Sequence, residues 1–152
     1  MAYASAEGRQ ELLDALAVAI EDIGQALADL GAAYEQLDEQ NADRLEAELF
    51  GPVQVAYGRA KRTHAEFAER HGLASRAFEG SAAGLPSTGA HGFIDDAVRA
   101  AAEADRGLSA LQDSSLAAEV GDVGLRSGLR DVRELLGSVR QRAQGLQRTL
   151  GR

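Results

Sequence analysis

Apolar residues in the first quarter of the chain recur at alternating steps of three and four. Between residues 12 and 37 this heptad spacing is typical of a helix that packs against other helices along a narrow stripe. The stripe consists of Leu13, Leu16, Ile20, Ile23, Leu27, Leu30, Tyr34 and Leu37. We therefore predict a first helix over about residues 6–39, with these side chains facing the core.

Similar stripes predict three further helices, over about residues 43–71, 92–118 and 122–150. Their apolar positions are Leu45, Leu49, Val53, Tyr57, Ala60, His64, Phe67 and His71 in the second, Ile94, Ala97, Ala101, Ala104, Leu108 and Leu111 in the third, and Leu125, Leu129, Val132, Leu136, Val139, Ala143, Leu146 and Leu150 in the fourth. Because nothing in the sequence resembles a strand, the fold class is all-α. We expect an antiparallel four-helix bundle that forms a single domain over residues 1–152.

Glycine and proline indicate where the helices are connected. Residues 72–91 contain four Gly and one Pro, so they predict a long loop between the second and third helices. At up to about 3.3 Å per residue, this loop could turn at one end or cross the whole bundle. The first turn also has two possible places. We favour residues 40–43, with Pro52 kinking the second helix, but Gly51-Pro52 could instead end a longer first helix.

Glycines at heptad spacing point to close contacts between helices. Gly24 and Gly31 lie one heptad apart beside the first stripe, and Gly124 and Gly128 form a Gly-x-x-x-Gly pattern in the fourth helix. A glycine inside a helix costs roughly 1 kcal/mol relative to alanine. Such a cost suggests that another backbone comes close. For the first pair, we expect a neighbour within the chain, and a contact between subunits is the alternative.

Composition limits the possible functions. The chain of 152 residues has 45% apolar residues, no Cys and a net charge of −8. A charge of this sign argues against general binding to nucleic acid or to an anionic membrane. The first helix is acidic and the last is basic, so we expect these two helices to lie side by side. Because the beginning of the sequence has no signal-peptide pattern, we expect a cytoplasmic protein, and the arginine-rich, lysine-poor composition suggests a bacterial origin.

Candidate chemistry is sparse. His64 and His71 lie on the second stripe, seven residues apart, which places them about 10.5 Å apart along a helix and makes a shared metal ion difficult. The sequence contains no Glu-x-x-His pair of the kind a di-iron bundle needs. The residues after each His also do not match a histidine phosphotransfer domain. We therefore predict no catalytic residue, no cofactor-binding residue and no metal ligand.

These observations favour a non-enzymatic helical bundle that acts as an interaction or scaffold protein, associating with itself or with a protein partner and not with nucleic acid or membrane. The alternative is a bundle that binds a small molecule or a metal. Its site would lie near His64, His71 and Tyr57, beside the loop 72–91, where polar aromatic residues face an alanine-rich helix.

Overall fold

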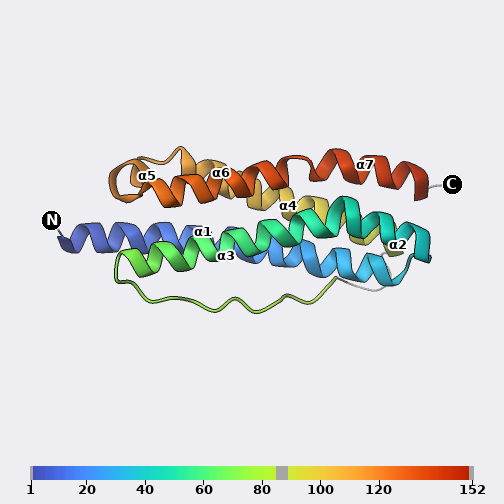
Figure 1. Ribbon diagram of the computed structural model, residues 1–152, viewed down its shortest axis with the longest axis horizontal. Coiled ribbons are helices and arrows are strands. Elements are labelled where there is room, and N and C mark those ends of the chain that lie inside the picture. Colours follow the sequence, from blue (N-terminus) through green and yellow to red (C-terminus); the bar gives the residue numbers. More distant parts are fainter. Residues whose placement is uncertain (1, 85–88, 151–152) are drawn as a thin grey trace.

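The computed structural model describes residues 2–84 and 89–150, and every regular element in these two ranges is helical (Figure 1). The all-α prediction is therefore confirmed. The helices run lengthwise beside one another, with the N-terminus at one end and the C-terminal end of α7 at the other. None of the described helices is long and apolar enough to cross a membrane.

The first helix, α1 (Ala2–Glu35), begins and ends about four residues earlier than we expected. The earlier end goes with Asp38, which caps the next helix by accepting hydrogen bonds from the backbone N–H of Asn41 (2.8 Å) and from its side-chain amide (3.2 Å). An aspartate in this position satisfies a backbone donor that has no partner inside the helix. The turn therefore lies at residues 36–38, and the prediction of a turn at 40–43 was wrong.

Between residues 39 and 70 the chain forms helix without interruption, as α2 (Glu39–Leu45), the π-helical turn η1 (Glu46–Phe50) and α3 (Gly51–Arg70). The alternative break at Gly51-Pro52 is thus wrong. Pro52 cannot donate to the carbonyl four residues before it, that of Glu48. This carbonyl accepts a hydrogen bond from Arg142 of α7 instead (3.4 Å). The wider turn η1 ends at Phe50, two residues before Pro52, close to the point where the regular hydrogen-bond ladder is interrupted.

After α3 the chain leaves the helical conformation at Gly72, which has φ of +67° and so takes a conformation that favours glycine. Residues 73–84 have no helix and run along the bundle, so the described part of the predicted loop crosses the bundle (Figure 1). The remainder of that loop lies partly outside the described residues, at 85–88. The helix α4 (Gly89–Gln112) begins three residues earlier than predicted.

The third predicted helix ends earlier than residue 118. Ser114 interrupts it, because its hydroxyl donates to the carbonyl of Leu111 (2.7 Å) and accepts from the N–H of Ala117 (3.1 Å). A short helix, α5 (Ser115–Val120), follows. The fourth predicted helix is divided at Ser138 into α6 (Val123–Gly137) and α7 (Val139–Leu150).

Most of the predicted stripe positions are buried in one hydrophobic cluster. Leu16, Ile23, Leu136 and Val139 are each at most 5% exposed, so the heptads of the first and last helices do face the core. Tyr34 is the clear exception, because the residue is 40% exposed. It is the penultimate residue of α1.

The charged helices do not pair as we expected. The elements that pack against α1 are mainly α3 and α4, whereas α6 packs against α3 and α4, and α7 against α4 and η1. The basic helices therefore do not lie beside the acidic first helix. Arg133 of α6 instead pairs with Asp105 of α4 (2.9 Å), and Arg59 of α3 pairs with Asp131 of α6 (3.1 Å).

The Gly-x-x-x-Gly pattern marks the close approach of α6 to α3. A Cβ atom added to Gly128 would lie 2.1 Å from Oγ1 of Thr63, and one added to Gly124 would lie 2.6 Å from the guanidinium of Arg70. In the same way, a Cβ on Gly24 would lie 3.3 Å from the ring of Tyr57. These three glycines make room for side chains of α3, and not for another backbone as we expected, while nothing lies within 4 Å of a Cβ on Gly31.

We predict that Gly128→Ala destabilises the protein by about 1–3 kcal/mol, as overpacking usually does, because Thr63 leaves no room for the added methyl group. The matched control is Gly58→Ala, in the middle of α3, where nothing lies within 4 Å of the added Cβ. That variant should gain up to about 1 kcal/mol in helix propensity. Urea denaturation would measure both changes, and equal stability of the two variants would contradict the close contact.

Candidate functional site

His64 is buried in α3, with 3% of its surface exposed. Its ring meets the ring of Phe78 edge-on, with 5.1 Å between the ring centres, and its Nδ1 atom has no hydrogen-bond partner within the described part of the chain. Burial, followed by the nearby positive charge of Arg76, lowers the pKa of His64 below its usual value of 6.5. The residue is therefore a neutral core histidine covered by the crossing segment 73–84.

The position of His64 along α1 follows from the early turn between the first two helices. It lies beside Leu13 and Asp14, whereas a turn at residues 40–43 would have placed it level with Ile20. Because two antiparallel helices share one turn, an earlier turn shifts their register by about twice the number of residues that the turn moves.

The crossing segment 73–84 is held along α1 by three polar contacts. Arg76 forms an ion pair with Glu21, the carbonyl of Ala82 accepts from the side-chain amide of Gln25 (2.9 Å), and the N–H of Gly84 donates to the carboxylate of Asp29 (3.1 Å). These α1 partners are four residues apart, so they lie on one face of the helix. Asp29 itself is only 2% exposed. Sequence reasoning missed it, since nothing in its neighbourhood distinguishes it from a surface aspartate.

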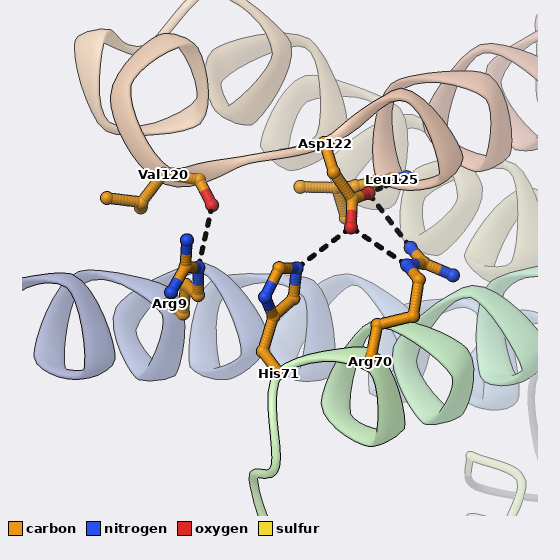
Figure 2. Close-up of polar contacts among 6 residues, drawn as sticks. All are labelled: Arg9, Arg70, His71, Val120, Asp122 and Leu125. Carbon is orange, nitrogen blue, oxygen red and sulfur yellow. Dashed lines mark hydrogen bonds and ion pairs between the residues drawn. The ribbon is translucent and has the colours of Figure 1, made fainter. Parts of the chain in front are cut away.

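His71 lies at the C-terminal end of α3 and takes part in a polar junction that joins α3 to α6. Figure 2 shows Asp122, the N-cap of α6, at its centre. Its carboxylate accepts from Arg70 through Nε (2.8 Å) and Nη2 (2.9 Å), from Nε2 of His71 (2.9 Å) and from the backbone N–H of Leu125 (2.7 Å). Burial alone would raise the pKa of Asp122, but these hydrogen bonds lower it far below its usual range.

The junction is completed at the same end of the bundle by Arg9 of α1. Its Nε donates to the carbonyl of Val120, the last residue of α5 (3.2 Å) (Figure 2). Four donors occupy the carboxylate of Asp122, so this aspartate cannot act as a base. The junction is thus well suited to fixing helix ends.

The three side chains of the alternative ligand site are not brought together. Tyr57 packs over Gly24, and Nζ of Lys61 lies 4.1 Å from the centre of its ring. His64 lies two turns further along α3 and His71 two turns beyond that, so Tyr57 and His71 are about 21 Å apart along the axis. Among the described residues, no group of three or more His, Asp or Glu side chains could hold a metal ion.

The surface has features that sequence reasoning did not find, on the two sides of the helix α2–η1. One is a groove of about 310 Å³ between the end of α1 and η1, lined by Gly31, Tyr34, Glu35, Glu46 and Phe50. We call it the acidic groove. Its wall is mainly apolar, its charged residues are carboxylates, and the open side of Gly31 helps to form it.

On the other side of α2–η1 lies a groove of about 620 Å³ between this helix and α7. Its lining includes Arg44, Glu48, Arg142, Gly145 and Arg148, and we call it the basic groove. Arg44 pairs with Glu48 within its own helix (3.6 Å). The excess of arginine gives this groove a positive charge in a protein whose net charge is −8.

Comparisons with protein-family models, with curated proteins and with solved structures found no match to this chain.

We predict that His64 makes the protein less stable as the pH falls through about 6.5. Because the pKa of His64 is lowered in the folded state, the unfolded chain binds a proton more readily, and acid favours unfolding. Each unit of lowering corresponds to about 1.4 kcal/mol. His64→Leu should remove this dependence between pH 7.5 and 5. Urea denaturation at several pH values would test this, and parallel curves for the two proteins would contradict it.

We also predict that Asp122→Ala is less stable than Asp122→Ser by about 1 kcal/mol, because serine keeps an N-cap acceptor for α6 and alanine does not. Both variants lose the ion pair with Arg70, so both should be less stable than the wild type. Thermal unfolding monitored by circular dichroism would rank the three proteins. Equal stability of the Asp122→Ser and Asp122→Ala variants would show that the N-cap of α6 does not contribute to stability.

Proposed function

We propose that this protein is a non-enzymatic association protein whose partner is a second copy of itself. The scaffold we propose is an antiparallel four-helix bundle. In this bundle α1 and α4 would each be one helix. The continuous helix α2–η1–α3 and the divided helix α6–α7 would be the other two, and α5 would belong to a connection. The cytoplasmic location expected from the sequence stays a prediction.

The observation that carries the proposal is the separation of charge between two faces of the chain. The helix α1 contains seven acidic residues and one arginine, whereas α6 and α7 together contain six arginines and two acidic residues. These helices do not pack side by side. Some of these charges are paired with other elements, as Arg133 is with Asp105 and Glu21 is with Arg76. The remaining exposed charges of the two faces are available to meet between two molecules.

Complementary charge of this kind acts mainly on how molecules find and orient one another. An acidic face and a basic face on the same chain favour contacts between copies in which unlike faces meet, and they disfavour contacts between like faces. The apolar wall of the acidic groove would add buried surface to such a contact. Electrostatic steering and apolar burial together are what a specific interface needs.

His64, His71 and Tyr57, the residues of the alternative ligand site, already have partners within the chain. This favours an association protein over a protein that binds a ligand at these side chains. His64 packs against Phe78, His71 and Arg70 hold Asp122, and Tyr57 fills the space above Gly24. Each of these side chains thus has a structural role. Acidic character also continues to argue against nucleic acid as the partner.

We predict that the protein self-associates at tens of micromolar in low salt and that added salt weakens the association. The reason is that salt screens exposed charges, with a screening length of about 10 Å at 0.1 M and about 3 Å at 1 M. Sedimentation velocity at several protein and NaCl concentrations would measure this. A single species at the chain mass of 16.0 kDa under every condition would reject the proposal.

A further inference from the structure

The acidic groove carries features that the fold itself does not require. Gly31 lies inside α1, where glycine weakens the helix, yet no atom lies within 4 Å of the position of a Cβ. Gly24, one heptad earlier, is explained by the ring of Tyr57, and no neighbour of that kind explains Gly31. The exposed side of α1 at Gly31 therefore leaves room for something outside the chain.

The chemistry of this groove selects a cationic side chain. Two aromatic residues, Tyr34 and Phe50, lie in the groove with the two carboxylates of Glu35 and Glu46. Aromatic rings attract cations through their π faces, and a guanidinium can also stack on a ring while it binds a carboxylate. Residues 34–46, without Arg44 of the basic groove, hold five acidic side chains and no basic one, which strengthens the preference for positive charge.

The chain itself supplies a complementary surface. Of its 16 basic residues, only Lys61 is a lysine, so almost every cation on its surface is a guanidinium. The basic groove presents Arg142 and Arg148 of α7, and nothing lies within 4 Å of a Cβ on Gly145 between them. A second helix can therefore approach α7 closely at this point, as it can approach α1 at Gly31.

The acidic groove and the basic groove lie close enough to one another to form parts of a single dimer interface. The elements α1 and α7 both pack against η1, and α2 lies at the same end of the molecule as the C-terminal end of α7 (Figure 1). A two-fold axis near α2–η1 would place the acidic groove of each copy against the basic groove of the other. Contacts of this reciprocal kind close after two copies.

We propose that the acidic groove is the docking site for the arginine-bearing face of α7 from a second copy of this chain, with Arg148 as the cation that it receives. This inference rests on the proposed function, self-association, and names the surface that carries it. Gly31 allows the close approach, Tyr34 and Phe50 receive the guanidinium, and Glu46 neutralises its charge.

The first test is Gly31→Lys, which fills the acidic groove with a cation of its own. The open position should tolerate the side chain, and loss of a helical glycine should keep the melting temperature at or above that of the wild type. We expect the dissociation constant, measured by sedimentation, to rise at least about tenfold, which corresponds to 1.4 kcal/mol. Gly58→Lys is the matched control, because its Cβ is equally open but lies on α3, and it should change the constant less than about threefold.

The second test exchanges the charges of the proposed contact. Glu46→Arg and Arg148→Glu should each weaken association at least about tenfold, since each places like charges against one another, and the double variant should recover most of the loss. Circular dichroism would establish that all variants are folded. If Gly31→Lys proves unfolded, Gly31→Ala, which also narrows the groove, would replace it.

Several outcomes would overturn the inference. Association that persists unchanged in Gly31→Lys and in both charge variants would show that self-association uses another face, which leaves the proposed function intact. A wild-type chain that stays monomeric would reject the proposed function as well. If that monomer bound an arginine-rich helical peptide through the acidic groove, as seen by chemical-shift changes at Tyr34, the groove would belong to a different basic partner and not to a second copy.

Discussion

The burial of α1 on two sides is the constraint on which the remaining structure depends. Its heptad stripe of leucine and isoleucine is accompanied by a second stripe of small residues, Ala19, Ala26 and Ala33, which are also buried. Ala19 lies 4.0 Å from the position of a Cβ on Gly107 of α4, so small residues of the two helices face one another. Small side chains let helix axes come close, and α1 packs more extensively against α4 than against any other described element.

Polar side chains then fix where each helix begins and which neighbours meet. Asp38, Ser114 and Asp122 each accept a backbone hydrogen bond at the start of a helix. Asp122 also binds Arg70 and His71, so the start of α6 is tied to the end of α3. Apolar contacts do not depend on direction, so the same apolar stripes could pack with neighbouring helices shifted along one another. Directed hydrogen bonds at the helix ends select one register, because a shifted register would leave these groups without partners.

The sequence predicted which residues of each helix are buried better than it predicted where each helix ends. Heptad spacing reports burial directly, and the stripes of the first and last helices pass through the boundaries that we misplaced. The breaks at Ser114 and Ser138 depend on a single residue, and serine also occurs inside helices. The second stripe on α1 escaped notice because alanine is common at every position of this chain. The acidic groove joins Gly31 and Phe50 from separate helices, so only a three-dimensional arrangement could reveal it.

Glycines inside helices have different structural causes, although they look alike in the sequence. Gly24 and Gly31 share a heptad position, and Gly128 and Gly145 both interrupt the basic end of the chain. At Gly24 and Gly128 a neighbouring side chain occupies the space that a Cβ would need, so close packing within the chain explains the residue. At Gly31 and Gly145 that space is open. Each of these open glycines lies in one of the two grooves that flank α2–η1, one acidic and one basic. Gly58 is equally open but lines neither groove, so an open glycine gains meaning only from its surroundings. It is the opposite charge of the two grooves that leads us to propose a second copy of the chain as the partner.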